Sequence, residues 1–197
     1  LRRLLAMLAA QQGGLLNLSS LGNALGVSYH TVKHGIDLLE GVFLVRRLPP
    51  YFCNVGKRLV KSPKVYVRDT GLLHHLLNIS TLAELDVHPI RGASWEGFVI
   101  EDLIRRERLT SPHSQFFFWR TAAGGEADLV IDRGSERIVV EVKANSGTSR
   151  GDAKRLERVL DDVGAVRGFV AGSGAASGQL TPRVQNLSLD LEPAWLP

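Results

Sequence analysis

The chain of 197 residues is poor in cysteine, with Cys53 as its single thiol. One cysteine cannot close an intramolecular disulfide or build a thiolate zinc cluster, and its isolation is typical of a reducing cytoplasm. No apolar run approaches the roughly 18 residues that a membrane-spanning helix needs, and no secretory signal pattern is present. The sequence also lacks the Gly-x-x-x-x-Gly-Lys-Ser/Thr phosphate-binding loop. These absences predict a cytoplasmic protein with no membrane partner, and with no ATP site in these residues.

Hydrophobic residues make up 44% of the chain, which is enough to bury a core. We expect two modest domains, covering residues 1–90 and 91–197. Because the chain opens at Leu1 inside a helical pattern, we also expect it to be a fragment of a longer protein.

The net charge of +4 is unevenly spread along the chain. Residues 1–70 carry +7, whereas the remainder carries −3. A positive field of this kind attracts polyanions, so the first part of the chain is expected to have a nucleic-acid partner, most simply DNA. A basic, solvated surface without a ligand is the alternative.

The first 40 residues show helical periodicity. Leucines form an apolar stripe over residues 1–11, and Gly13-Gly14 ends it. Residues 17–26 and 27–39 then resemble a helix-turn-helix, with Gly26 permitting the turn.

Side-chain caps and an inward face support this interpretation. Ser19 or Ser20 is expected to cap the first helix of the pair, and Ser28 the second. The second helix would direct three apolar residues inward, namely Val32, Ile36 and Leu39.

Apolar segments 42–48 and 64–68 are expected to pair as strands and so complete a winged helix. The candidate nucleic-acid contacts are Tyr29, His30, Thr31, Lys33 and His34 on the outer helix face and Lys57, Arg58 and Lys61 between the strands. A winged helix can grip DNA through phosphates and groove edges, but the same fold also serves as a protein-docking module. Both interpretations stay open.

A hairpin near the middle of the chain carries the strongest chemical signal. Segments 126–132 and 137–143 read as strands, and Gly134-Ser135 suits a two-residue type II′ turn. Counting outward from that turn sets Asp128 opposite Glu141, and Glu126 opposite Lys143. Residues two apart on a strand share a face, so Asp128, Glu141 and Lys143 are expected to converge.

Two carboxylates at one point repel each other, and a divalent cation such as Mg²⁺ or Mn²⁺ relieves that repulsion. Lys143 would then lie near an attacking water, where it can orient the water, help to deprotonate it or stabilise charge on a phosphate. The alternative is a solvated hairpin whose opposite charges pair across the strands.

Asp128 followed by Glu141-Val142-Lys143 resembles the signature of the PD-(D/E)xK nuclease superfamily. That resemblance implies a restriction-endonuclease-like α/β domain with a mixed sheet, and an acidic residue on the preceding helix that completes the site. Glu96 and Glu101 are the candidates, and Glu96 is preferred because it shares its helix rows with apolar Ile100. The departure from the pattern is Ala127, where the superfamily name has proline.

The remaining pattern is that of an α/β fold. A helix is expected over 94–108, an aromatic strand over 115–120, a helix over 152–163, and strands over 166–171 and 186–191. Arg120 could contact phosphate or pair with Glu126.

Several motifs in order resemble the uncharacterised C-terminal domain of prokaryotic AAA-type ATPases. They are Lys57 to Leu73, Trp95-Glu-Gly-Phe-Val-Ile-Glu101, Phe118-Trp-Arg-Thr121 and Glu126-Ala-Asp128. The resemblance implies an ATPase module preceding this chain, which would hold the ATP. The expected function is metal-dependent hydrolysis of DNA phosphodiesters; the alternative is a non-catalytic DNA- or protein-binding regulatory module.

Other catalytic patterns fail on their surroundings. Asp69-Thr70-Gly71 spells the aspartic-protease triplet, but a capped helix start explains it, and no second matching carboxylate exists. His74, His75 and His88 lack a cysteine or acidic partner at ligand spacing.

Overall fold

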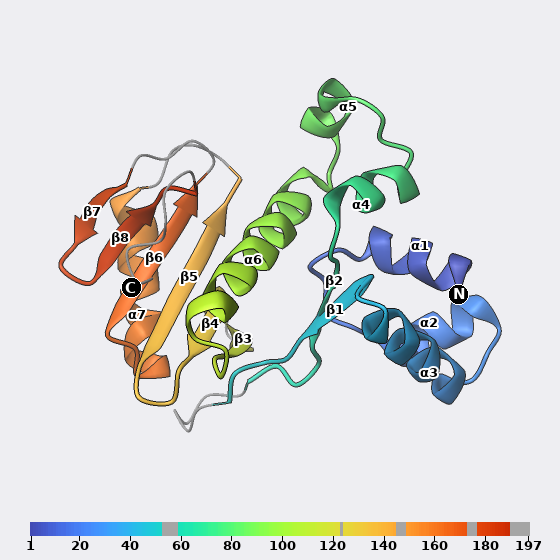
Figure 1. Ribbon diagram of the computed structural model, residues 1–197, viewed down its shortest axis with the longest axis horizontal. Coiled ribbons are helices and arrows are strands. Elements are labelled where there is room, and N and C mark those ends of the chain that lie inside the picture. The colour runs from blue at the N-terminus through green and yellow to red at the C-terminus, as the bar shows by residue number, and fades with distance from the viewer. Residues whose placement is uncertain (53–58, 123, 145–148, 173–176, 190–197) are drawn as a thin grey trace. The chain divides into compact units, whose positions relative to one another are not determined.

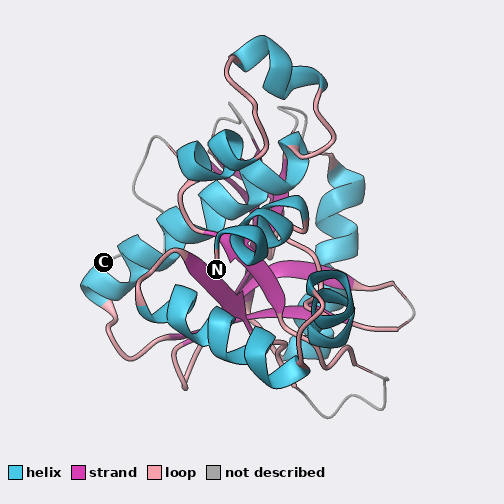
Figure 2. Ribbon diagram, turned by 90° about the vertical axis from the view of Figure 1, so that its right-hand side faces the viewer, coloured by secondary structure: helices cyan, strands magenta, loops and turns pink. Residues whose placement is uncertain are grey.

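The computed structural model describes residues 1–197 apart from 53–58, 123, 145–148, 173–176 and 190–197. It is a mixed α/β protein, as Figure 2 shows by secondary structure. The chain forms two compact units. The first contains residues 1–48 and 62–98, and the second contains residues 49–61 and 99–197. Among the described residues, no helix is long and apolar enough to cross a membrane.

The first unit begins with three helices, which are α1 (Arg2–Ala10), α2 (Leu18–Leu25) and α3 (Tyr29–Gly41). Ser28 caps α3 by accepting a hydrogen bond from the Thr31 N–H, as predicted. The cap of α2 was predicted wrongly. Asn17, not Ser19 or Ser20, accepts from the Ser20 N–H, because the helix begins two or three residues earlier than the serines suggested.

Gly26 ends α2 with φ of 68°, in the left-handed region that glycine enters without strain. The inward face of α3 is also as predicted, since Val32, Ile36 and Leu39 are all buried. They pack with leucines of α1 and α2 in one apolar cluster. This cluster fixes the three helices against one another.

A two-stranded antiparallel sheet follows, made of β1 (Val45–Leu48) and β2 (Lys64–Val67). The predicted pairing is confirmed, but β1 starts later than residue 42. The N–H groups of Val42 and Phe43 donate back to carbonyls of α3, so these residues belong to the end of the helix. The loop between α1 and α2 runs along the other edge of β2, where the Gly13 N–H donates to the Val65 carbonyl at 2.8 Å.

Two short helices complete the first unit before the long helix, namely α4 (Thr70–Leu76) and α5 (Leu82–Val87). Asp69 caps α4 through the Leu72 N–H at 2.6 Å, which confirms the structural interpretation of the Asp69-Thr70-Gly71 triplet. Thr81 and Glu84 form a reciprocal capping box on α5.

Helix α6 (Arg91–Thr110) contributes residues up to Phe98 to the first unit and residues from Val99 onward to the second. The second unit contains a six-stranded mixed sheet in the order β3-β4-β5-β6-β8-β7. Its strands are β3 (Gln115–Arg120), β4 (Glu126–Asp132), β5 (Arg137–Lys143), β6 (Arg167–Gly172), β7 (Gly178–Thr181) and β8 (Val184–Leu187). Strands β5, β6 and β8 are parallel, and the other pairings are antiparallel (Figure 1).

The β4–β5 hairpin has the predicted register. Leu129 pairs with Val140, and the Arg133 N–H donates to the Glu136 carbonyl to close the turn. Gly134, the first central residue of the turn, has φ of 85°, and Ser135, the second, does not have a positive φ. A type II′ turn requires this combination. The same register, continued by one residue, sets Asp128 opposite Glu141.

Helix α7 (Arg150–Val163) packs across one face of this sheet (Figure 1). Its buried side chains, among them Leu156 and Leu160, join the strands in the core of the second unit. Gly168 of β6 allows this close approach, since a Cβ there would lie 3.0 Å from Leu156 Cδ2. A capping box formed by Ser149 and Asp152 fixes the start of the helix beside the hairpin.

Residues 49–61 contribute to the second unit, which the sequence did not predict. The Phe118 N–H donates to the Pro49 carbonyl, and the Tyr51 N–H donates to the Phe118 carbonyl. The Val60 N–H donates to the Arg120 carbonyl. The open edge of β3 is therefore covered in part by the described residues Pro49, Tyr51 and Val60.

Candidate functional site

A cavity of about 540 Å³ lies where the β4–β5 hairpin meets α7. The strands contribute Glu126, Glu141 and Lys143 to its wall, and α7 contributes a row of charged side chains one turn apart. The volume falls within the range of small-molecule sites. The charged residues that α7 supplies are Asp152, Arg155, Arg158 and Asp162.

Glu141 and Lys143 form a close pair within this cavity. The Lys143 Nζ donates to Glu141 Oε1 at 2.6 Å. The second carboxylate oxygen, Glu141 Oε2, is buried and has no hydrogen-bond partner in the described part of the chain. An acceptor removed from water without a partner is costly, and buried groups of this kind are rare in folded proteins.

Asp128 lies on the neighbouring strand, at the position opposite Glu141. Its carboxylate is buried, and Oδ2 accepts from the Val142 N–H at 2.9 Å. Since residues directly opposite on an antiparallel pair share a face, Asp128 and Glu141 belong to the same side of the sheet. Asp128 is not part of the cavity wall itself. The sequence therefore predicted the pairing correctly and missed the deeper position of Asp128.

The electrostatics of the cavity act chiefly on Glu141. Burial and then the negative charge of Asp128 raise the pKa of Glu141 to about 7, against the lowering effect of Lys143. For Lys143, burial acts to lower the pKa, but the hydrogen bond and charge of Glu141 outweigh it, and the pKa is raised. Lys143 is therefore a cation at neutral pH, suited to stabilising negative charge rather than to accepting a proton.

The predicted helper acid on α6 lies in the first unit, while the hairpin lies in the second. Glu96 Oε1 accepts hydrogen bonds from the buried Lys64 Nζ at 2.9 Å and from the Tyr66 hydroxyl at 2.5 Å. Glu101, the other candidate, is half-buried and belongs to the same unit as the hairpin.

The residues that could hold a divalent cation are thus Asp128 and Glu141. Of the residues that the structure describes, no three histidine, cysteine, aspartate or glutamate side chains are arranged to hold a metal ion. Two carboxylates still suit Mg²⁺ or Mn²⁺, because these ions commonly bind through one or two carboxylates with substrate phosphate and water. The unpartnered Glu141 oxygen fits such an ion.

Sequence reasoning missed the part of the site that α7 supplies. The available signal was the spacing of four charged residues along the helix, since Asp152, Arg155, Arg158 and Asp162 recur three or four residues apart. Arg120, considered for phosphate contact, instead lies 3.7 Å from Glu126.

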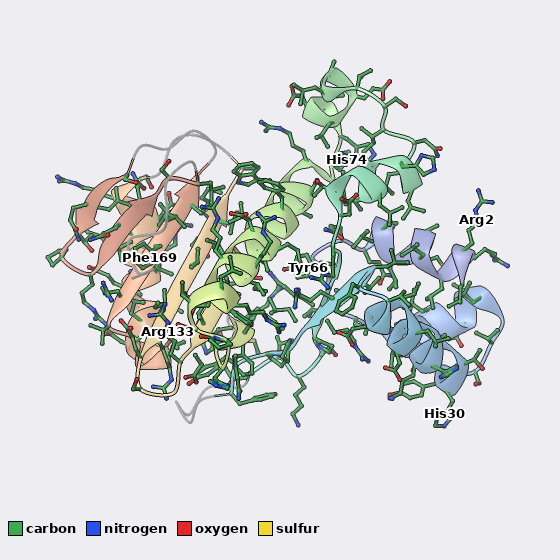
Figure 3. All side chains as sticks on the ribbon, in the orientation of Figure 1. Arg2, His30, Tyr66, His74, Arg133 and Phe169 are labelled. Carbon is green, nitrogen blue, oxygen red and sulfur yellow. The ribbon has the colours of Figure 1, made fainter. Side chains whose placement is uncertain are left out.

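The predicted nucleic-acid face of α3 is exposed. Tyr29, His30, Thr31, Lys33 and His34 all face solvent, and Figure 3 shows His30 projecting outward. The Lys33 Nζ donates to Asp37 at 3.0 Å, one turn along the helix. Lys61 is exposed and belongs to the second unit, while Lys57 and Arg58 lie outside the described residues.

Of the histidines considered, His74 has a clear structural role. Its Nε2 lies 2.7 Å from the buried Ser94 hydroxyl, within the first unit (Figure 3). Burial lowers the pKa of His74, so a neutral ring that hydrogen-bonds Ser94 is favoured at neutral pH.

Fold and site together define a mixed α/β protein with an acidic hairpin beside a charged helix. Residues 91–189 match the family described as "Domain of unknown function (DUF4143)", and residues 1–83 match "Domain of unknown function (DUF8612)". The first of these matches covers half of the chain, so the chain belongs to the DUF4143 family.

Two mycobacterial proteins are similar to the chain. They are "Uncharacterized protein Mb2031c" of Mycobacterium bovis and "Uncharacterized protein Rv2008c" of Mycobacterium tuberculosis. Each is 40% identical over 149 residues, which is 76% of this chain and 33% of the relative. The chain therefore spans about a third of the length of these curated relatives. No solved structure matches the chain.

Proposed function

We propose that the second unit hydrolyses DNA phosphodiesters with the help of Mg²⁺ or Mn²⁺. Asp128 and Glu141 would bind the cation, and Lys143 would act on the phosphate. The observation that carries this proposal is the buried Glu141 Oε2, which has no hydrogen-bond partner among the described residues. A cation at this point would satisfy that oxygen and reduce the repulsion that raises the pKa of Glu141.

Each residue has a distinct part in the proposed reaction. Asp128 is held by the Val142 N–H, which fixes its carboxylate against β5. Glu141 supplies the second carboxylate, in the wall of the cavity. When bound, the cation would supply Lewis acidity toward the phosphate and assist attack by water.

Lys143 is the group that meets the charge built up in the reaction. Hydrolysis joins a water oxygen to phosphorus and releases a deoxyribose oxygen, which leaves as a hydroxyl group. Because the pKa of Lys143 is raised, its ammonium stays charged and can stabilise the phosphate oxygens as that bond changes. Its hydrogen bond to Glu141 holds it in position.

The proposal is tested by cleavage of a labelled DNA substrate with Mn²⁺. Asp128→Asn, Glu141→Gln and Lys143→Met should each lower the rate by about 100-fold, since each removes a charged group near the reacting phosphate. Lys154→Ala is a matched control, because Lys154 is exposed on α7 and is not part of the cavity wall. Cleavage that persists in Asp128→Asn would refute the assignment.

We propose that Glu101, rather than Glu96, is the acidic residue of α6 that completes the cation site. Glu96 is already bonded by Lys64 and Tyr66 in the first unit, whereas Glu101 shares a unit with the hairpin. In the same assay, Glu101→Gln should slow cleavage more than Glu96→Gln does.

A second candidate is a non-catalytic DNA- or protein-binding module. The exposed face of α3 supports it, together with the order of three helices, β1 and β2, and the loop along β2, an arrangement typical of a winged helix. We also propose that the chain forms the C-terminal region of an AAA-type ATPase, with ATP bound in a preceding module. The motif resemblance and the greater length of the relatives support that association.

A further inference from the structure

Arg158 of α7 stands out among the charged residues of the cavity. It is exposed, it lines the cavity, and it makes no ion pair or hydrogen bond within the described chain. The other cations are engaged. Lys143 is bonded to Glu141 at 2.6 Å, and Arg155 is bonded to Asp152 at 2.5 Å.

The acids of the cavity keep its total charge near zero. Glu126 lies 3.7 Å from Arg120, and Asp162 also has an interaction partner. A phosphate entering this space would therefore be attracted mainly by the cation whose charge is not already matched. A guanidinium is well suited to that contact, since its fork of N–H donors fits two phosphate oxygens.

The dimensions of the cavity limit what can enter it. About 540 Å³ is the volume of a small-molecule site, which has room for nucleotide units of one strand but is too small to enclose a duplex. On one side lie Glu141 and Lys143 of β5, and on the other lies Arg158 of α7. A strand in this space would have one phosphate beside the hairpin and an adjacent phosphate beside the helix.

We propose that α7 forms a phosphate-binding wall for a single DNA strand, with Arg158 as the residue that contacts its backbone. This inference rests on the proposed phosphodiester hydrolysis and names the strand state of its substrate. Arg158 binds and positions the strand, while Glu141 and Lys143 face the phosphate that reacts.

The test measures binding of the full chain to a fluorescent six-nucleotide thymidylate strand by anisotropy, over a range of salt, in EDTA and in Ca²⁺. Arg158→Ala should weaken binding by about 3- to 10-fold and lower the salt slope by about 0.7, the value for one contact to a single strand. Arg158→Lys should keep most of the salt slope of the natural protein, because lysine keeps the positive charge. Lys154→Ala, on the same helix but outside the cavity, should change binding less than twofold.

Equal losses in Arg158→Ala and Lys154→Ala would overturn the proposal, as would no binding of the strand at millimolar concentration. A blunt duplex that competes as well as the single strand would overturn the strand preference. Asp128→Asn separates this inference from the cation site. It should abolish any gain from Ca²⁺ while the contrast between Arg158→Ala and Lys154→Ala remains. If Arg158→Ala binds the strand more weakly than Lys154→Ala does, but Ca²⁺ does not strengthen binding, the result supports the phosphate-binding wall and contradicts the cation site.

Discussion

Glu141 is the residue on which the proposed chemistry depends, and its environment makes protein stability depend on pH. Burial and the charge of Asp128 raise its pKa from 4.5 to about 7 in the folded protein. The folded state therefore favours the protonated carboxyl. The protonated carboxyl therefore stabilises the folded state fully below pH 4.5, and this stabilisation is lost as the pH rises through about 7.

Glu141→Gln should remove this dependence, because glutamine is neutral at every pH. In EDTA, the variant should match the natural protein near pH 4.5 and exceed its free energy of unfolding at pH 8 by roughly 1–3 kcal/mol. Urea denaturation at the two pH values measures the difference. If the variant and the natural protein differ in free energy of unfolding by the same amount at both pH values, the pKa of Glu141 is not raised.

The buried Glu107 has a structural role within the second unit. Its side chain is 0% exposed, and its oxygens accept from Arg133 Nε at 2.7 Å and from a terminal guanidinium nitrogen at 2.8 Å. Ser114 donates a further hydrogen bond at 2.6 Å. This cluster joins α6 to the turn of the β4–β5 hairpin, and that hairpin carries the candidate site.

Glu107→Ala should lower the free energy of unfolding by about 3–5 kcal/mol, because it leaves the Arg133 charge without its buried partner. Asp161→Ala is the matched control. Asp161 pairs with Arg183 at 2.6 Å but is 70% exposed, so its loss should cost less than about 1 kcal/mol. Urea denaturation of both variants compares the two ion pairs. Similar losses would contradict the structural role of Glu107.

At the scale of elements, most helices and strands follow from periodicity. The bounds of β3, β4 and β5 match the sequence prediction, because apolar runs between turn residues mark buried strands clearly. Short-range competition caused the misses. Asn17 competed with Ser19 and Ser20 as a cap, and Val42 continued α3 instead of opening a strand. Strand β7, with two exposed residues at its start, has little apolar pattern to reveal it.

The arrangement of the candidate site was predictable only where it is local in sequence. Asp128 and Glu141 meet through one hairpin, whose register the turn residues determine. The contribution of α7 depends on how the helix packs on the sheet, and hydrophobic periodicity does not fix that position. The same limit applies to Pro49, Tyr51 and Val60, which bond to β3 although they lie more than 50 residues earlier.

The exposed face of α3 makes a separate prediction at this scale. If α3 contacts DNA phosphates, Lys33→Ala should weaken duplex binding at low salt and reduce the salt slope by about 1. Lys33 would exchange its ion pair with Asp37 for a phosphate. Filter binding or anisotropy with a duplex measures the slope, and Lys154→Ala in the other unit serves as control. Binding that is absent, or unaffected by salt, would favour a protein-docking role for this face.

At the scale of the whole molecule, each unit has its own buried core. The first presents an exposed helix face with basic residues, and the second holds a cavity lined by Glu141 and Lys143. The proposed DNA contact and the proposed hydrolysis therefore belong to different units, and substitutions in α3 and in the β4–β5 hairpin test them separately.

The proposed hydrolysis depends above all on whether Asp128 and Glu141 bind a divalent cation. The most direct test is the melting temperature of the natural protein and of Asp128→Asn with and without millimolar Mn²⁺. At an Mn²⁺ concentration one hundredfold above the dissociation constant, binding adds about 2.7 kcal/mol to the free energy of unfolding. This should raise the melting temperature by several degrees. Asp161→Asn, which changes an exposed acid, should keep the full rise, and Asp128→Asn should lose it. No rise in the natural protein, or an equal rise in Asp128→Asn, would contradict cation binding by Asp128 and Glu141.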